Sequence, residues 1–265
     1  MEQKDSADVV EIPIAEIAMK ERLAKGGFGE VYRATWDEKN VAVKVIETEI
    51  QDDEAVKYEI NLTLRLSHPN IIDMYGITRV KPNQLGIVME MAEHGSLDSW
   101  IGTIDHEKQQ KIALGIIDGL AYVHSQKIIH RDIKPKNILM FGSQDDMIPK
   151  IADFGVSKNV EDGTALTAVG QELYMAPEVT THAPYSFTAD IFSLAVTLFE
   201  LFNEKCLSQS SPEVRRFVLS AYGTRPGKIP RSCTCPEYLR DVIERGLQSS
   251  YERPPLFKYC EVIQG

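Results

Sequence analysis

The chain has 265 residues, of which 43% are hydrophobic and 26% charged, and its formal net charge is -10 at pH 7. This composition is that of a globular protein large enough to bury a sizeable core. The negative net charge gives no electrostatic basis for binding nucleic acid or an anionic membrane. An anionic ligand would therefore need positive groups placed locally around it.

The sequence shows no export signal and no membrane span. Residues 1–12 lack the basic and then apolar parts of a secretory signal, and the most apolar run, residues 191–202, falls short of the roughly 20 residues that cross a bilayer. Cys233 and Cys235 form a C-T-C whose spacing is not that of a structural zinc site. Without CxxC pairs or a regular cysteine framework, reduced thiols and a cytoplasmic location are expected.

The first third of the sequence predicts a small sheet with one helix. A charged stretch, residues 53–67, predicts a helix that ends at His68-Pro69-Asn70, because proline restricts the residue before it. The lobe closes near Glu90. Alternating or β-branched residues predict strands at 30–34, 41–47, 71–77 and 85–92.

Beyond Gly95 the pattern becomes helical. Residues 106–125 place apolar side chains at intervals of three and four, which is the period of one helix face. A β-rich lobe followed by a helical one predicts a ligand-binding cleft at their junction. The expected buried face consists of Ile112, Ile116, Leu120 and Val123, and further helices are expected at 191–202 and near Pro212, Pro236 and Pro254.

A glycine-rich stretch, LAKGGFGEVY at residues 23–32, lies between strand-like segments. By itself it predicts a β-hairpin at least as readily as a phosphate-binding loop. Ala24 also stands where such a loop often begins with glycine. The choice between the two depends on the rest of the chain.

Four later segments favour the phosphate-binding loop. In order and spacing they resemble the signature set of the protein kinases, and the resemblance runs from about Leu23 to Arg253. It implies an α+β, two-lobed protein kinase fold with a small β-rich N-lobe containing one main helix and a larger α-helical C-lobe. The segments are VAVK at 41–44, IIHRDIKPKNIL at 128–139, IADFG at 151–155 and YMAPE at 174–178.

The resemblance also implies a division of the chain. Residues 1–16 would form an N-terminal extension and residues 17–265 the catalytic domain. Within that domain, the N-lobe would cover residues 17–90 and the C-lobe residues 93–265. Residues 90–92 match the hinge between the lobes. The chain looks most like the tyrosine-kinase-like group of serine/threonine kinases in three segments: "GSL" after the hinge, "LSHPNII" and "YMAPE".

Phosphoryl transfer needs a catalyst that positions groups and neutralises charge. By resemblance, Lys44 contacts the α- and β-phosphates of ATP and is held by Glu59. Asp132 accepts or orients the proton of the substrate hydroxyl, and Lys134 contacts the transferred phosphate. Taken singly, these residues would be interpreted as solvated side chains or loop caps. Only the whole set favours catalytic roles.

The same resemblance implies ATP and Mg²⁺. Asn137 and Asp153 match the two magnesium ligands, which fits the preference of that ion for hard oxygen donors. Strand alternation puts Ala42 and Lys44 on one face and the neighbouring valines on the other. Residues that match nucleotide-binding positions are Gly26, Gly29, Val31, Ala42, Lys44, Met89, Glu90, Ala92 and Leu139.

Several other matches are structural. Glu178 and Arg253 correspond to an ion pair of the large lobe, Asp190 to a residue that braces the catalytic loop, and His130 to a packing residue. Three residues depart from the family pattern. Ala24 replaces the first loop glycine, Thr63 stands where an apolar residue is usual, and Gln171 where threonine is usual.

The predicted function is transfer of the γ-phosphate of ATP to serine or threonine of a protein substrate. Val156 matches a residue that goes with a threonine preference, and phosphorylation of Thr167 is expected to recruit Arg131 and raise activity. One alternative is a pseudokinase that serves as a scaffold or binding module, which the three departures support. The other is a tyrosine or dual-specificity kinase, against which Lys134 argues.

Overall fold

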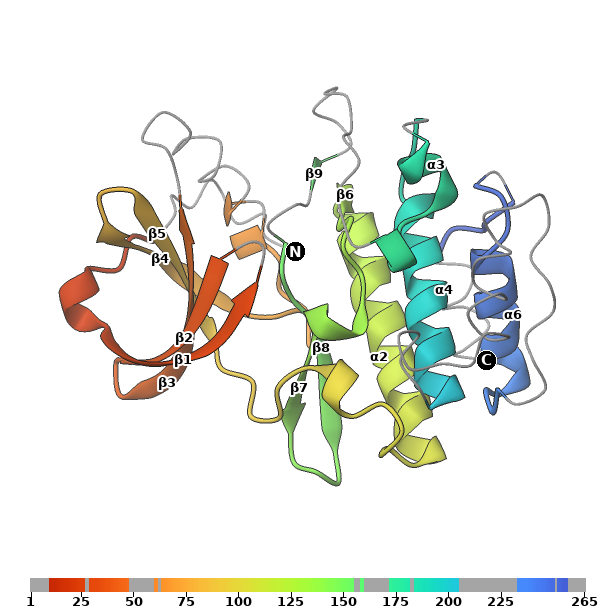
Figure 1. Ribbon diagram of the computed structural model, residues 1–265, viewed down its shortest axis with the longest axis horizontal. Coiled ribbons are helices and arrows are strands. Elements are labelled where there is room, and N and C mark those ends of the chain that lie inside the picture. The colour runs from red at the N-terminus through yellow and green to blue at the C-terminus, as the bar shows by residue number, and fades with distance from the viewer. Residues whose placement is uncertain are drawn as a thin grey trace. The chain divides into compact units, whose positions relative to one another are not determined.

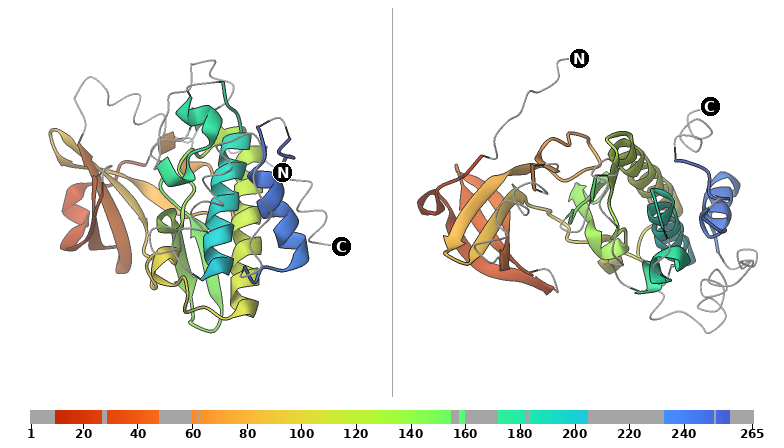
Figure 2. Two further views of the ribbon diagram at one scale, coloured as in Figure 1. Left: turned by 45° about the vertical axis from the view of Figure 1, so that its right-hand side comes forward. Right: turned by 90° about the horizontal axis from the view of Figure 1, so that it is seen from above.

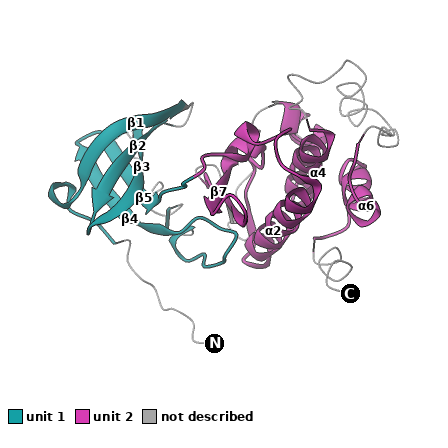
Figure 3. Ribbon diagram, turned by 90° about the horizontal axis from the view of Figure 1, so that it is seen from below, with its two compact units in different colours: residues 1–93 teal, residues 94–265 magenta. Residues whose placement is uncertain are grey.

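The computed structural model describes residues 10–26, 29–47, 60–61, 63–154, 158–159, 172–181, 184–204, 233–250 and 252–256. The chain forms two compact units, Met1–Glu93 and His94–Gly265, coloured separately in Figure 3. The first unit is rich in strands and the second in helices, which confirms the predicted α+β class.

Unit 1 is built on a five-stranded antiparallel sheet with the order β1-β2-β3-β5-β4 (Figure 1). The predicted strands at 30–34 and 41–47 are confirmed and are longer than expected. The strand predicted at 71–77 begins only at Met74, because Ile71 and Ile72 are buried ahead of the sheet. The bounds are β1 Ala18–Gly26, β2 Gly29–Trp36, β3 Lys39–Glu47, β4 Met74–Lys81 and β5 Gln84–Glu90.

The last predicted strand, residues 85–92, also ends early. Glu90 closes β5 by bonding to the segment before β4: its N–H donates to the Asp73 carbonyl at 3.0 Å, and its carboxylate accepts from the Asp73 N–H at 2.8 Å. Met91 and Ala92 therefore lie beyond the sheet.

One face of β3 supplies the core of unit 1. Val41, Val43 and Val45 pack together with Ala34 of β2 and Val88 of β5, as the alternation of this strand predicts. The opposite face of β3 carries Ala42 and Lys44.

Residues before β1 take part in this sheet. Ile12 donates its N–H to the Ile77 carbonyl at 2.7 Å, and Ile77 donates to the Val10 carbonyl at 2.9 Å, so the segment runs parallel to β4. A Cβ at Gly76 would lie 2.3 Å from the Val10 oxygen, so only glycine permits this approach. The short helix η1, Ile14–Glu16, then leads into β1.

The helix predicted at 53–67 is described only in part. Residues 60, 61, 63 and 64 are helical, and Ile60 and Thr63 are buried. Glu59 lies outside the described residues.

Unit 2 is built around α2, His106–Ser125, and α4, Thr188–Asn203, with α6, Glu237–Gly246, against α4 (Figures 1 and 2). Asp105 caps α2 by accepting a bond from the Lys108 N–H at 3.0 Å. The predicted apolar face of α2 is completely buried, which confirms its period. Its members are Ile112, Ile116, Leu120 and Val123.

The apolar sequence of α4 fits a helix that is buried on nearly all sides. A Cβ at Gly246 would lie 2.6 Å from the Ala195 Cβ, so glycine lets α6 approach α4 closely. The helix predicted near Pro236 is confirmed as α6. The one predicted near Pro212 lies outside the described residues, and those near Pro254 that are described, 252–256, are not helical.

Short strands and a short helix complete unit 2. A hairpin between Asn137 and Asp153 is formed by β7, Ile138–Gly142, and β8, Met147–Ile151, while β6, Ile128–Ile129, pairs with β9, Lys158–Asn159. The helix α3 spans Pro177–Thr180. In the described parts of both units, no helix combines the length and the apolar character needed to cross a membrane.

Candidate active site

Three predicted site residues meet in the loop between β6 and β7. The Lys134 ammonium donates to Asp132 Oδ2 at 2.6 Å, and the Asn137 amide donates to the same oxygen at 2.8 Å. The amide nitrogen of Asn137 also donates to the Asp132 carbonyl at 2.7 Å. These bonds fix the carboxylate of Asp132 in one orientation.

The second oxygen of Asp132 is in a different situation. Asp132 is only 4% exposed, and its Oδ1 is buried without a hydrogen-bond partner among the described residues. A buried carboxylate oxygen without a donor is unfavourable, and such atoms are rare in folded proteins. The loop thus presents an acceptor that a donor from another molecule would satisfy.

A buried carboxylate of α4 holds this loop. Asp190 Oδ1 accepts from the Arg131 N–H at 2.8 Å, and Oδ2 accepts from the His130 N–H at 2.8 Å and bonds to His124 Nε2 at 2.9 Å. Burial by itself would raise the pKa of Asp190, but its interactions with His124 and His130 together outweigh burial and lower that pKa. The predicted brace is therefore confirmed. His124 was not predicted as part of this brace, because its only signal in the sequence is its place in the last turn of the predicted helix.

His130 joins the loop to the segment before Asp153. The Asp132 N–H donates to His130 Nδ1 at 3.3 Å, which assigns the ring proton to Nε2, and Nε2 donates to the Ala152 carbonyl at 3.1 Å. The ring is completely buried, and burial lowers the pKa of His130 despite nearby carboxylates. The Phe154 ring packs edge-on against the imidazole ring, with the two ring centroids 4.7 Å apart. His130 is thus a neutral packing residue, as expected.

Asp153, the second candidate metal ligand, comes directly after Ala152 in the chain. The Ala152 N–H donates to the Asn137 carbonyl at 2.8 Å, which ties the residue before Asp153 to the residue that would share the metal ion. Asp153 itself adopts a left-handed backbone with φ 64°. Such a conformation is uncommon outside glycine and is frequent at functional sites.

In unit 1, the candidate nucleotide-binding residues share one sheet face. Val31 pairs directly with Lys44, and Ala42 pairs with Met89. Directly paired residues of antiparallel strands, and residues two apart in one strand, lie on the same face. All four therefore lie opposite the valine core. Leu139 belongs to β7 in unit 2, where it bridges to Ser96.

The glycine-rich turn is described at its two ends. Gly26 pairs with Gly29, and Ala24 pairs with Val31 as an exposed residue of β1. Gly29 has φ +125°, and a Cβ there would lie 2.2 Å from the Val45 carbonyl oxygen. The sequence suggested approach to phosphates as the reason for this glycine; close packing of β2 on β3 is a second reason that the sequence did not indicate.

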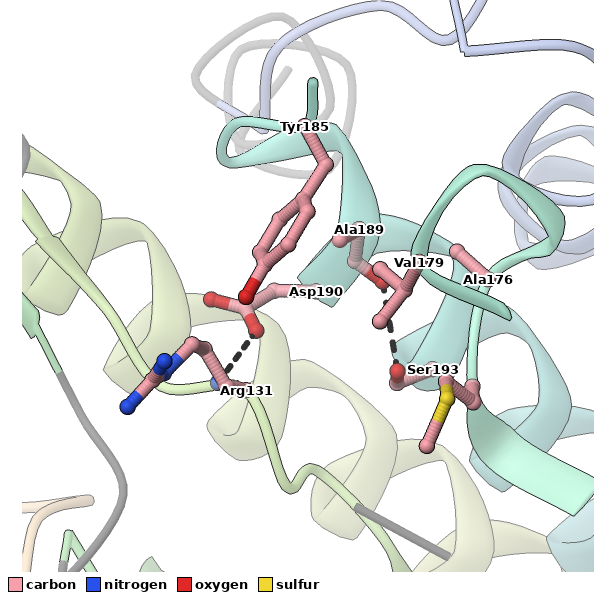
Figure 4. A pocket seen from close by; sticks show the side chains of 8 residues that line it. Arg131, Ala176, Val179, Tyr185, Ala189, Asp190 and Ser193 are labelled. Carbon is pink, nitrogen blue, oxygen red and sulfur yellow. Dashed lines mark hydrogen bonds between the residues drawn. The ribbon is translucent and has the colours of Figure 1, made fainter. Parts of the chain in front are cut away.

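Arg131 lines a small pocket of unit 2 together with Tyr185, Asp190 and Ser193 (Figure 4). Its backbone has φ 69°, and its Nε and Nη1 are buried without a hydrogen-bond partner in the described part of the chain. Buried guanidinium donors favour an anionic partner. Thr167, the predicted source of that anion, lies outside the described residues, as do Val156 and Gln171.

The predicted ion pair of the large lobe is confirmed. Arg253 donates to both carboxylate oxygens of Glu178, at 3.1 Å from Nη2 to Oε2, and to the Thr188 carbonyl at 3.0 Å. Nε donates to the Gln248 carbonyl at 2.8 Å. This arginine thereby joins α3, the start of α4 and the segment after α6.

Comparison with known proteins identifies the class to which this fold and site belong. A family model described as "Protein kinase domain" matches residues 17–256. The chain therefore belongs to the protein kinase family.

Individual relatives come from several eukaryotes. The chain is 32% identical over 269 residues to serine/threonine-protein kinase STY17 of Arabidopsis thaliana, with 98% of this chain and 46% of that protein covered. It is 40% identical over 193 residues to serine/threonine-protein kinase pakE of Dictyostelium discoideum, with 69% of this chain and 20% of that protein covered. It is 34% identical over 276 residues to mitogen-activated protein kinase kinase kinase 10 of Mus musculus, with 96% of this chain and 29% of that protein covered. The chain thus spans less than half the length of these relatives.

Proposed function

We propose that this chain is a serine/threonine protein kinase, which transfers the γ-phosphoryl group of ATP to hydroxyls of a protein substrate. The observation that carries the proposal is Oδ1 of Asp132, which has no hydrogen-bond partner among the described residues. Lys134 and Asn137 hold Oδ2, so the buried Oδ1 remains to accept a hydrogen bond from a substrate hydroxyl. The names of the serine/threonine-protein kinase relatives support the same reaction.

The reaction asks the protein mainly for position and charge. Asp132 orients the attacking hydroxyl and takes up its proton as the new O–P bond forms, while the bond from the γ-phosphorus to the bridging oxygen breaks and ADP leaves. Lys134, whose ammonium lies 2.6 Å from the Asp132 carboxylate, supplies positive charge for the transferred phosphoryl group. Lys44 contacts the α- and β-phosphates, and Glu59, outside the described residues, holds it.

Asn137 and Asp153 fit a magnesium ion. Asn137 uses only its amide nitrogen in its bonds to Asp132, which leaves its amide oxygen as a metal ligand. Asp153 supplies a carboxylate, and Mg²⁺ prefers such hard oxygen donors. When bound, the ion would neutralise the negative charge of the phosphates.

ATP would use the sheet face of unit 1 that lies opposite the valine core. Small and apolar residues on this face suit a flat base, since they leave room for it and exclude water. The residues proposed to contact the nucleotide are Gly26, Gly29, Val31, Ala42, Lys44, Met89, Glu90 and Ala92, with Leu139 from unit 2.

The decisive variant is Asp132→Asn. Incubated with labelled ATP, Mg²⁺ and a generic protein substrate, it should lose transfer to the protein while it still binds ATP, because only the proton acceptor is changed. Asp153→Asn should weaken binding of Mg²⁺-ATP as well. Asp145→Asn is the matched control, since the Asp145 side chain is fully exposed.

Other outcomes would favour the alternatives. Wild-type protein that binds ATP but modifies neither itself nor any generic substrate would indicate a pseudokinase that serves as a binding module. Phosphotyrosine as the main product would indicate a tyrosine or dual-specificity kinase. A serine preference in matched peptides would contradict the threonine preference that Val156 suggests.

We also propose that phosphate on Thr167 pairs with Arg131. The buried donors of Arg131, which have no hydrogen-bond partner within the described ranges, support this, because a phosphothreonine carries about -1.5 to -2 charge and accepts several hydrogen bonds. After preincubation with ATP, Thr167→Ala and Arg131→Ala should lose activity to a similar extent. Their losses should not add in the double variant. Unchanged activity in both single variants would contradict the switch.

A further inference from the structure

A short segment before β1 is attached to unit 1 by two buried side chains. Residues 10–17, which we call the strap, include η1 and lead directly into β1. Ile12 and Ile17 are 2% and 6% exposed, whereas the residues between them are exposed. Two isoleucines therefore anchor a segment that is otherwise open to solvent. None of the strap residues belongs to the site proposed above.

The strap pairs with β4 at a position that requires glycine. The Ile77 N–H donates to the Val10 carbonyl at 2.9 Å, and the Ile77 carbonyl accepts from the Ile12 N–H at 2.7 Å, so the strap satisfies both of these backbone groups. The pairing of β4 with β5 shifts register just before Gly76, and a Cβ on this glycine would lie 2.3 Å from the Val10 oxygen. A side chain at this position would therefore push the strap off the sheet.

A continuous row of paired residues connects the strap to Lys44. Directly paired residues of neighbouring antiparallel strands lie on one face of the sheet. Ile77 and Ile87, which are 1% and 6% exposed, therefore lie on the same face as Lys44 and extend from it toward the strap. In order from the strap, the row consists of Glu11, Ile77, Ile87, Lys44 and Val31.

The two anchors reach the same strand from the opposite face of the sheet. Ile12 and Ile17 belong to one core cluster with Val43 and Val45, the residues before and after Lys44 in β3. Loss of the anchors would leave a cavity in this core, and a core relaxes only in part around a cavity. The strap thus supports the strand that carries Lys44 both through the row of paired residues and through the core.

We propose that the strap positions Lys44 for ATP, so that the docked strap strengthens ATP binding and its detachment weakens it. This inference rests on the proposed function, because it takes Lys44 as a ligand of the phosphates. Segments with few buried side chains open locally while the rest of the domain stays folded, and two anchors make the strap such a segment. Coupling of this kind is reciprocal, so ATP must favour the docked strap by the same factor.

Hydrogen exchange in the wild-type protein tests this reciprocity. The Ile12 and Ile77 N–H groups should exchange faster than the amides of the central strand β3, because detachment of the strap releases both. Saturating Mg²⁺-ATP should slow the exchange of both by about tenfold. The Lys108 N–H, which bonds to Asp105 in unit 2, is the control and should not respond.

Two results of this measurement would overturn the inference. One is unchanged exchange of Ile12 and Ile77 in a protein that binds ATP, which would leave the proposed function intact. The other is exchange of these amides as slow as that of β3, since the strap would then not detach by itself. Wild-type protein that binds no ATP would instead contradict the proposed function, and the inference with it.

Variants of the full chain give an independent measurement. Gly76→Ala and Ile12→Ala should each weaken the binding of Mg²⁺-ATP about tenfold, measured by calorimetry at a temperature where circular dichroism shows them folded. Ile14→Ala is the matched control, because Ile14 lies in the strap but is 38% exposed, and it should bind ATP like wild type. Wild-type affinity in folded Gly76→Ala and Ile12→Ala would overturn the inference. If neither variant folds, the exchange measurement on the wild-type protein decides.

Discussion

Gly29 and Gly95 both have positive φ but differ in what a side chain would meet. A Cβ at Gly29, with φ +125°, would lie 2.2 Å from the Val45 oxygen, whereas at Gly95, with φ +67°, it would meet nothing within 4 Å. We expect Gly29→Ala to lower the free energy of unfolding by about 3 kcal/mol, because strain and steric overlap add. Gly95→Ala should cost only about 1 kcal/mol of strain.

Urea unfolding of the two variants checks this. Equal losses would show that the left-handed backbone alone, rather than the contact between β2 and β3, determines the need for glycine at Gly29.

His130 gives the stability a pH dependence of known sign. Burial lowers its pKa below the 6.5 of a free histidine, so the unfolded chain binds a proton that the folded chain refuses. The stability that neutral His130 contributes is therefore complete above the unfolded-state pKa of 6.5. It is lost as the pH falls from 6.5 through the lower pKa of the folded state. The slope is at most about 1.4 kcal/mol per pH unit for one proton.

The comparison of His130→Gln with wild type measures this contribution. Between about pH 7 and pH 5.5, before most carboxylates titrate, the variant should lose stability with pH less steeply than wild type. His106→Gln is the control, because His106 is an exposed residue of α2. A slope that is unchanged in His130→Gln would mean that the buried ring accepts a proton without unfolding.

Among single residues, the sequence predicted identities better than contacts. Asp132, Lys134 and Asn137 lie within six positions and match a family motif, so their clustering followed from local spacing. The bond from His124 to Asp190, and the lack of a partner for Asp132 Oδ1 in the described part of the chain, depend on how distant segments pack. Sequence periodicity carries no information about such tertiary contacts.

At the scale of elements, Arg253 and Glu178 link three segments of unit 2. Their side chains are 1% and 10% exposed. Arg253→Met should lower the free energy of unfolding by about 3–5 kcal/mol, because it leaves the Glu178 carboxylate largely buried without its partner. Denaturant unfolding monitored by circular dichroism measures the loss.

An exposed ion pair of the same unit is the control. Arg245 and Asp241 lie 2.9 Å apart on α6 with side chains 58% and 54% exposed, so Arg245→Ala should cost at most about 1 kcal/mol. Similar losses in both variants would mean that burial of the Glu178 pair contributes nothing.

Elements with a strong period were the most predictable. The helix at 106–125 was located by its apolar face and is observed with the same bounds. The strand predicted at 71–77 was misplaced at its start. Ile71 and Ile72 are apolar because they are buried, but they lie in the segment before β4 and not in the strand itself. The pairing of residues 10–12 with β4 was missed, since it joins segments far apart in the chain.

At the scale of the whole molecule, each unit has its own core and its own tryptophan. The valine face of β3 centres unit 1, and α2 with α4 centres unit 2. The chain has two tryptophans, Trp36 in β2 and Trp100 in unit 2. Replacing either one by phenylalanine leaves a fluorescent reporter in the other unit alone.

Because each unit has its own core, we expect a destabilising substitution in one unit to leave the stability of the other unit unchanged. Ile12 is 2% exposed in the core of unit 1, so Ile12→Ala should cost about 2–5 kcal/mol. In a Trp100→Phe background, Ile12→Ala should lower the urea midpoint reported by Trp36. In a Trp36→Phe background, the midpoint reported by Trp100 should stay unchanged.

Ile14→Ala controls for the loss of methyl groups as such, because Ile14 is 38% exposed and outside that core. It should move neither midpoint by much, since little of its apolar surface is removed from water in the folded protein. If Ile12→Ala instead shifts both reporters equally, the two units unfold as one cooperative block. In that case the compactness of each unit would not translate into independent stability.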